Sequence, residues 1–200
     1  MAYSLPEPLK ALVEQLSGLP GLGPKSAMRM AIAMLKWPEA RTRQLGAAIG
    51  TLRDSLALCG RCGAISSAEI CPICADPDRD QTTLCIVPEW DSLLALEAGG
   101  FYSGCYFVLG GLLAPMQKDS QPEFTRLYQR LAERGIAEVI LALGSTLEAE
   151  NTATFIKQEL ARKFPAVRVS RLAQGLPLGA EVKYMDRETL RQSMQHRQQL

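Results

Sequence analysis

Four cysteines form two matched pairs in the first half of the chain, in the order Cys59-x2-Cys62-x8-Cys71-x2-Cys74. Each CxxC pair is typical of a tight knuckle that directs two thiolates toward one point, and two knuckles make the closed tetrahedral four-sulfur site that Zn²⁺ prefers. The linker between the pairs is too short for much of a hydrophobic core, so a bound metal must supply folding energy. Four thiolates leave no position open to water, and we therefore expect a structural zinc ion.

Two other kinds of cysteine chemistry share parts of this pattern. A redox-active dithiol uses one CxxC pair, whereas this chain has two. An iron–sulfur cluster also takes four thiolates, and the spacing alone does not separate it from zinc; ligand type and closure favour zinc. The two remaining cysteines, Cys85 and Cys105, fall within segments expected to be strands. We interpret them as buried hydrophobic residues rather than ligands.

The segment GLPGLGPKSA, residues 18–27, has the residue types of a phosphate-binding turn. It departs from the nucleotide-binding pattern GxxxxGK[ST], because Pro24 follows Gly23 and Lys25 therefore comes one residue late. A nucleotide-binding loop of that class also follows a strand, whereas helical periodicity precedes this turn. Both differences argue against a nucleotide site and leave a nucleic-acid backbone as the candidate source of phosphate.

A turn with two glycines between two helices is typical of the helix-hairpin-helix DNA-binding motif. Gly21 and Gly23 allow the backbone to approach a phosphate closely. Pro24 suits the first position of a helix, whose free N–H groups and dipole attract an anion. Lys25 and Arg29 are four residues apart and share a face. We therefore expect the two glycines and these two basic residues to contact DNA phosphates independently of base sequence; an ordinary helix–helix turn with solvated side chains is the alternative.

Composition sets the class of protein. The chain has 200 residues, 47% hydrophobic and 22% charged, with a net charge of +1, which suits one modest or two small globular domains. The charge is uneven, since residues 24–53 hold one acid and a group of basic residues that would attract a polyanion. These basic residues are Lys25, Arg29, Lys36, Arg41, Arg43 and Arg53.

Targeting signals are not recognisable in the sequence. The start of the chain lacks a charged segment followed by an apolar block, and no apolar run approaches 18 residues. We therefore expect a cytoplasmic protein with neither signal peptide nor membrane span. In that compartment six cysteines do not indicate a disulfide framework.

The elements that must position these residues differ between the two halves. Apolar residues recur with helical spacing over 9–16, 27–35 and 45–56, which predicts a small helical unit. Its core would be thin, so we expect it to pack on a neighbour or a second copy of itself. Residues 57–77, around the cysteines, have little periodicity.

The second half predicts a parallel sheet covered on both faces, because short β-branched or aromatic runs alternate with amphipathic helices. We expect a long loop over 110–121, a last strand over 181–185 and a C-terminal helix. The other predicted strands are 84–87, 105–109, 139–143 and 167–169, and the predicted helices are 92–98, 123–134 and 150–164.

Several motifs in this order resemble those of the bacterial RecR family of recombination proteins. LPGLGPKSAMRMA resembles the family's helix-hairpin-helix, and CGRCGAISSAEICPIC resembles its zinc finger. YFVLGGLLAP, EVILALGSTLEAENTATFI and RLAQGLPLGAE resemble successive parts of its Toprim domain and C-terminal segment. The resemblance implies an α/β multidomain protein. Its four expected parts are a helical helix-hairpin-helix DNA-binding region (1–55), a four-cysteine zinc finger (56–78), a Toprim-like parallel α/β domain (79–174) and a C-terminal strand–helix segment (175–200).

The resemblance also implies a function, that of a DNA-repair mediator rather than an enzyme. RecR-like proteins self-associate, as dimers or tetramers, into rings or clamps. They join RecO, and in many bacteria RecF, at single-stranded gaps and junctions with duplex DNA, where they help load RecA. In this chain the DNA-contact role falls on Lys25 and Arg29. A zinc-stabilised interaction module without DNA contact is a competing interpretation.

A Toprim domain raises an enzymatic alternative, a Mg²⁺-dependent nuclease or primase-like enzyme. Such chemistry uses a glutamate after the first strand and an acidic pair after a later one. Glu148 and Glu150 match the pair, but Pro88 stands at the first position and Glu89 is displaced by one residue, which points its side chain elsewhere. An intact metal site is not expected. The pair is a candidate partner contact, a vestigial Mg²⁺ site, or acids favourably placed at a helix start.

Further departures from the family pattern lie in the same half of the chain. Gly144-Ser145 replaces an Asn-Pro pair before the acidic motif, and Lys183 replaces a common glutamate. We expect these changes to bear on partner contacts and to leave the zinc and DNA-binding modules intact.

Overall fold

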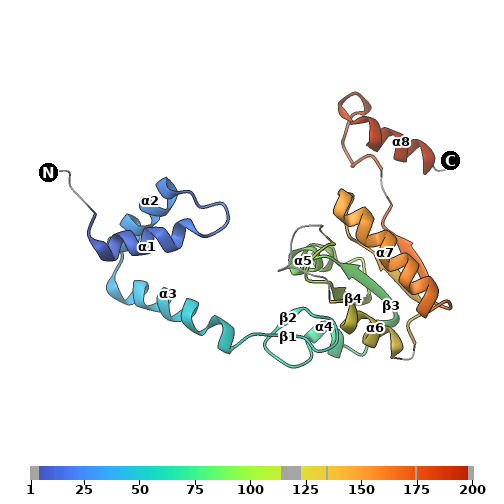
Figure 1. Ribbon diagram of the computed structural model, residues 1–200, viewed down its shortest axis with the longest axis horizontal. Coiled ribbons are helices and arrows are strands. Elements are labelled where there is room, and N and C mark those ends of the chain that lie inside the picture. The colour runs from blue at the N-terminus through green and yellow to red at the C-terminus, as the bar shows by residue number, and fades with distance from the viewer. Residues whose placement is uncertain (1–4, 114–122, 134, 174, 198–200) are drawn as a thin grey trace. The chain divides into compact units, whose positions relative to one another are not determined.

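The computed structural model describes residues 5–113, 123–133, 135–173 and 175–197 (Figure 1). The chain divides into two compact units, Met1–Ser55 and Leu56–Leu200. In the described residues, no helix is both long and apolar enough to span a bilayer.

The N-terminal unit is helical, as predicted. It contains α1 (Glu7–Ser17), α2 (Pro24–Leu35), α3 (Glu39–Thr51) and the short 3₁₀ helix η1 (Leu52–Asp54). Prolines begin the helices, because a proline at the first turn loses no intrahelical hydrogen bond. The glycine turn connects α1 to α2, and these two helices pack together.

Burial within the helical unit is confined to a few small residues. Ala27 and Ala31 of α2 are fully buried, whereas Leu35 is 73% exposed and Ile49 of α3 is 67% exposed. The apolar stripe of α3 contains no buried residue. The packing of α1 on α2 offers too little surface to bury the apolar stripes of all three helices. Much of this apolar surface is therefore exposed to solvent in the single chain.

The cysteine-rich segment is more regular than its sequence indicated. It forms the antiparallel pair β1 (Ala57–Leu58) and β2 (Ile65–Ser66), followed by the one-turn helix α4 (Pro72–Ala75). The two strands pair over only two residues each, which is too short to produce a periodic signal in the sequence.

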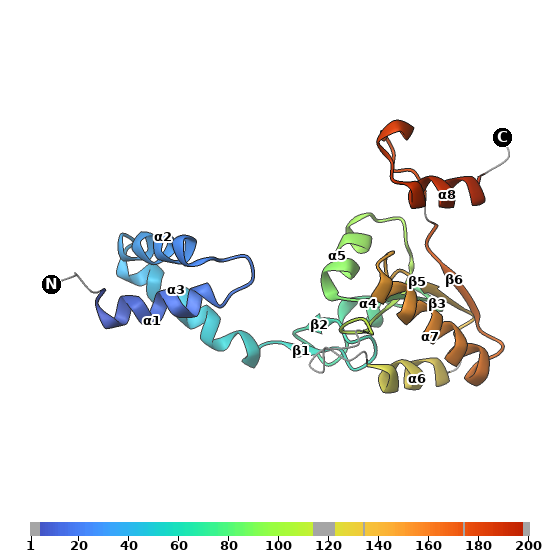
Figure 2. The same cartoon turned by 45° about the horizontal axis from the view of Figure 1, so that its top comes forward.

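A four-stranded parallel sheet follows, with strand order β4-β3-β5-β6 (Figures 1 and 2). Every predicted strand from 84 to 169 and every predicted helix from 92 to 164 is present, with shifted ends. The strands are β3 (Asp80–Val87), β4 (Gly104–Val108), β5 (Glu138–Leu141) and β6 (Arg168–Arg171), and the helices are α5 (Trp90–Ala98), α6 (Phe124–Ala132) and α7 (Leu147–Lys163).

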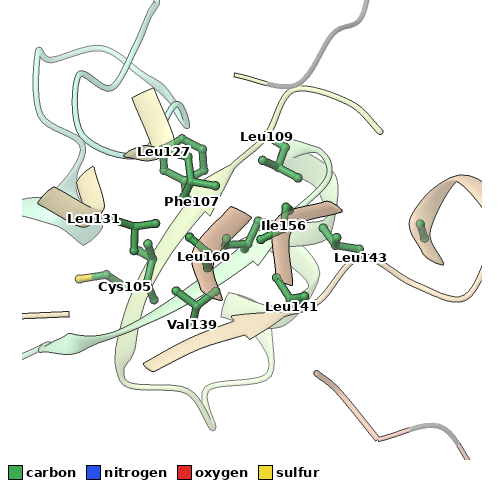
Figure 3. Packing of buried hydrophobic residues seen from close by; sticks show 13 residues of the cluster. Cys105, Phe107, Leu109, Leu127, Leu131, Val139, Leu141, Leu143, Ile156 and Leu160 are labelled. Carbon is green, nitrogen blue, oxygen red and sulfur yellow. The ribbon is translucent and has the colours of Figure 1, made fainter. Parts of the chain in front are cut away.

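One face of the sheet packs against α6 and α7. Alternate strand residues such as Ile86 and Phe107 meet Leu127 from α6 and Ile156 from α7 in one buried cluster. Figure 3 shows these helix side chains directed into the strand residues. Cys105 belongs to this cluster and is 1% exposed, as expected for a buried hydrophobic residue.

The opposite face is covered by α5 and by the cysteine module. Its strand residues include Cys85, Val87 and Tyr106, which pack with Leu93 of α5 and with the four paired cysteines. Cys85 is buried here, and this burial raises the pKa of its thiol to about 11. The prediction of a sheet covered on both faces is confirmed, but part of the cover on this face comes from the metal-binding module rather than from a helix.

The predicted last strand over 181–185 is wrong. This segment forms the 3₁₀ helix η2 (Val182–Tyr184), followed by α8 (Arg187–Gln195). The amides of Tyr184 and Met185 donate to the carbonyls of Glu181 and Val182, so local bonds replace the ladder that a strand needs. Most of the expected loop over 110–121 lies outside the described residues.

Candidate metal centre and nucleic-acid interface

The four paired cysteines converge on one point. The Sγ atoms of Cys59, Cys62, Cys71 and Cys74 lie within 4.8 Å of one another, and all four residues are buried. The Sγ atoms of Cys62 and Cys71 are 3.6 Å apart. Among the described residues, no other group of three or more His, Cys, Asp or Glu side chains lies close enough together to hold a metal ion.

Backbone amides support the sulfur atoms. The N–H of Ala64 donates to the Cys62 Sγ at 3.4 Å, and the N–H of Cys71 donates to the Cys59 Sγ at 3.3 Å. Cys71 also caps α4, since its Sγ accepts from the N–H of Cys74. Donors aimed at sulfur stabilise thiolates and orient metal ligands.

The thiolate of Cys62 opposes the ionisation of Cys71 and Cys74. Hydrogen bonding, chiefly to Cys74, lowers the pKa of Cys62 to about 6, whereas burial raises the pKa of Cys71 to about 11. The pKa of Cys74 is raised, mainly by its hydrogen bond to Cys62. One thiolate therefore forms readily and its negative charge opposes the next. A bound divalent metal removes this repulsion, so the donor set fits Zn²⁺.

A backbone hydrogen bond connects the metal centre to the sheet. The N–H of Val108 on β4 donates to the Cys62 carbonyl at 2.8 Å. Gly63 has φ +74°, and a Cβ there would lie 3.0 Å from the Val108 oxygen and 3.1 Å from Nη1 of Arg126 on α6. The sequence carries no signal that pairs Gly63 with Val108 or Arg126, so this contact could not be predicted from it.

The glycine turn has the geometry expected for a phosphate contact. Gly21 adopts φ +78°, and Gly23, in an extended conformation, precedes Pro24 at the start of α2. No side chain caps this helix start in the described structure. Lys25 and Arg29 are both exposed. Over the described part of the chain, neither forms an ion pair, so both charges are available to an external anion.

Two other basic residues of the same unit, Lys10 and Arg43, are engaged by acids. The Lys10 Nζ lies 3.9 Å from carboxylate oxygens of both Glu7 and Glu14. Arg43 donates from Nε to the Glu39 Oε1 at 2.9 Å. Lys25 and Arg29 therefore differ from Lys10 and Arg43 in having no acidic partner among the described residues.

The Toprim acidic positions do not assemble into a carboxylate cluster within the described residues. Pro88 follows the end of β3, and Glu89 is exposed at the start of α5. Glu148 and Glu150 lie in the first turn of α7. Glu150 accepts two hydrogen bonds from Arg171 of β6, at 2.7 and 3.0 Å. This ion pair joins the helix start to the sheet edge and partly neutralises the acidic pair.

A pocket of about 370 Å³ lies at the carboxyl ends of β5 and β6. Parallel sheets of this class bind ligands at that edge. Its described lining contains no carboxylate, and it is formed by Leu141, Gly144, Ser145, Arg171, Leu172, Ala173, Gly175, Thr189 and Gln192. Gly144, one of the departures from the family pattern, adopts φ +86° there.

Family models match almost the whole chain in consecutive segments. The RecR helix-hairpin-helix model matches residues 9–52, and the RecR four-cysteine zinc finger domain model matches 56–76. A Toprim domain model matches 82–173, and the RecR C-terminal model matches 175–198. The zinc finger match and the four converging, buried cysteines together support zinc as the cofactor.

Similar proteins match this chain over almost its full length. The recombination protein RecR of Nitratidesulfovibrio vulgaris is 64% identical over 199 residues, covering 98% of each chain. That of Maridesulfovibrio salexigens is 49% identical, over 98% of this chain and 99% of the relative, and that of a Cyanothece species is 38% identical over 96% of each. Identity at this level across the full length, with the family's zinc finger and helix-hairpin-helix in place, shows that the chain belongs to the RecR family of recombination proteins.

Proposed function

We propose that the protein is a DNA-binding mediator of recombinational repair that acts without catalysing a reaction. Family membership supports the repair role. The finer part of the proposal is that it forms a ring or clamp, acts with RecO and with RecF where present, and helps load RecA at single-stranded gaps. It grips single-stranded, duplex and junction DNA through phosphates, without reading bases.

The observation that carries DNA binding is the start of α2. A glycine at φ +78°, an uncapped helix start and two exposed basic side chains meet within the short segment from Gly21 to Arg29. Backbone N–H groups at a helix start bind phosphate oxygens, and the helix dipole adds to the attraction. We assign the contacts to Gly21, Gly23, Lys25 and Arg29.

Replacement of Lys25 and Arg29 by alanine tests this assignment. Each lost phosphate contact should reduce the slope of log K against log salt concentration by about 0.9 on duplex and about 0.7 on single strands. We expect the double variant to lower affinity for all sequences alike, with a flatter salt dependence measured by fluorescence anisotropy.

A matched control removes two basic residues that have acidic partners. Lys10→Ala with Arg43→Ala deletes the same charge from the same unit, but at sites already engaged by Glu7, Glu14 and Glu39. We expect a much smaller change in slope. Equal slopes for the two double variants would show that net charge, rather than the glycine turn, determines binding.

Self-association is supported by the open apolar surface of the helical unit. Ile49 of α3, Leu52 of η1 and Leu35 of α2 are each more than half exposed. Surface of this kind is typical of a protein–protein interface. We infer that a second copy covers it and that the assembled form is a dimer or tetramer, which mass photometry would measure directly.

The remaining assignments concern the α/β half and the location. We infer that Glu148, exposed at the start of α7, contacts a protein partner, and that Glu150, paired with Arg171, belongs to the same contact surface.

We also propose that the four parts of the chain divide after residues 55, 78 and 174. A cytoplasmic location is consistent with four thiols held for metal rather than for disulfides.

A further inference from the structure

The corner between α2 and α3 carries groups that the proposed phosphate contacts do not use. Lys36 follows Lys25 by eleven residues and Arg29 by seven, and its backbone is still helical at φ −88° and ψ −8°. This spacing places Lys36 on the same face as Lys25 and Arg29. Lys36 is exposed, and it has no ion-pair partner among the residues that the structure describes.

The three basic residues form a line along the helix. At a rise of 1.5 Å per residue, Lys25 and Lys36 are separated by about 16 Å along the axis. A DNA strand advances about 3.4 Å per nucleotide in the B form, so the line matches about five nucleotides of one strand. Its far end is the α2–α3 corner.

An aromatic and a planar cation are stacked at that corner. The guanidinium carbon of Arg41 lies 3.9 Å from the ring centroid of Trp37. Trp37 is partly buried and Arg41 is exposed. The neighbouring acid, Glu39, is engaged by Arg43 instead. The cation–π contact therefore holds the Arg41 guanidinium over the ring without a competing carboxylate.

This arrangement suits an unpaired nucleobase. Bases of single strands stack on aromatic rings and on arginine planes, whereas bases within a duplex already have both faces covered. We propose that Trp37 and Arg41 form a stacking platform for single-stranded DNA, reached along the phosphate path of Lys25, Arg29 and Lys36. The proposal rests on the proposed DNA binding and adds a preference for unpaired strands over duplex.

The fluorescence of Trp37 reports stacking directly. The chain has two tryptophans, so Trp90→Phe leaves Trp37 as the single reporter. The titrants are oligo(dT) of about 16 nucleotides, an abasic strand of equal length, and a duplex; this length is the upper site size of one OB fold, a common single-strand-binding fold. We expect strong quenching by oligo(dT) and little by the other two. Equal quenching by the abasic strand, or none by oligo(dT), overturns the proposal.

Arg41→Lys separates stacking from charge, because lysine keeps the charge and loses the planar group. One stacked base contributes an affinity factor between about 5-fold and about 150-fold. We expect Arg41→Lys and Trp37→Phe to weaken oligo(dT) binding toward the lower end of that range, with duplex affinity and the salt slope unchanged. Wild-type affinity of Arg41→Lys for oligo(dT) contradicts the platform.

The two proposals fail in different ways. If Lys25→Ala with Arg29→Ala leaves the salt slope intact, the DNA-binding assignment of the glycine turn is lost. The other outcome is that this variant behaves as expected but the ratio of single-strand to duplex affinity is the same in wild type and in Arg41→Lys. In that case the phosphate contacts of the glycine turn are supported and only the stacking platform is refuted.

Discussion

Gly63 joins the metal centre to the sheet, and its replacement by alanine gives a sharp test of that contact. The residue adopts φ +74°, in the region where a side chain is strained. A Cβ would also lie 3.0 Å from the backbone oxygen of Val108, which has no freedom to rotate away. The hydrogen bond between the Val108 N–H and the Cys62 carbonyl lies at the same place.

The expected cost has two parts. Left-handed backbone costs a non-glycine residue about 1–2 kcal/mol. A shift that relieves the contact weakens the bond from Val108, and a typical hydrogen bond contributes about 0.5–1.5 kcal/mol. We therefore expect Gly63→Ala to lower the free energy of unfolding of the Leu56–Leu200 unit by about 1.5–3.5 kcal/mol. It should also speed zinc release, because the hydrogen bond that connects the cysteine module to the sheet is weakened.

Alanine replacements at two other glycines separate the cost of backbone strain from the cost of the contact with Val108. Gly100 has φ +64°, but a Cβ added there would have no atom within 4 Å, so Gly100→Ala measures backbone strain alone. Gly60 lies in the same knuckle as Gly63, and its Cβ would be 3.8 Å from the nearest atom, the Glu69 oxygen. Gly60→Ala should therefore be nearly neutral.

Urea denaturation followed by circular dichroism, with zinc release followed by a chromogenic chelator, measures both effects. The expected order of destabilisation is Gly63→Ala, then Gly100→Ala, then Gly60→Ala. If Gly63→Ala costs no more than Gly100→Ala and releases zinc at the wild-type rate, the contact with Val108 does not anchor the metal centre, and the reasoning is refuted.

Two further predictions concern the metal and the pH dependence. The purified protein should hold one zinc ion per group of four cysteines by elemental analysis. Chelation should lower the melting temperature of the α/β unit because the module covers part of one face of the sheet, and an unchanged melting temperature after complete zinc removal would contradict this. Hydrogen bonds, first from Lys163 and then from Arg162, lower the pKa of Glu159 from 4.5 to about 2. The folded-state pKa is depressed, so this stabilisation is present above about pH 4.5 and is lost as the pH falls toward 2. The difference in melting temperature between wild type and Glu159→Gln should become smaller as the pH falls across that window. A difference that stays constant would show that the hydrogen bonds of Lys163 and Arg162 to the Glu159 carboxylate are not its source.

Local chemistry explains why so much of the fold could be predicted. Pro24 begins α2, and the short apolar runs that contain Ile86 and Phe107 indicate the strands, because each signal depends on residues close in sequence. The prediction failed at 181–185, where a β-branched and aromatic run pairs with no strand among the described residues and forms local backbone hydrogen bonds as η2. Strand formation requires a partner, and a single segment does not record whether one exists.

The sequence by itself determined the metal site and the glycine turn, since the CxxC spacing and the helix-starting proline act over a few residues. Only the tertiary structure decided that the cysteine module covers part of one face of the sheet and is hydrogen-bonded to it between Cys62 and Val108. It also decided that Glu150 of α7 is engaged by Arg171 of β6. These contacts depend on side chains and backbone groups brought together by the packing of separate elements, and no spacing rule along the chain encodes them.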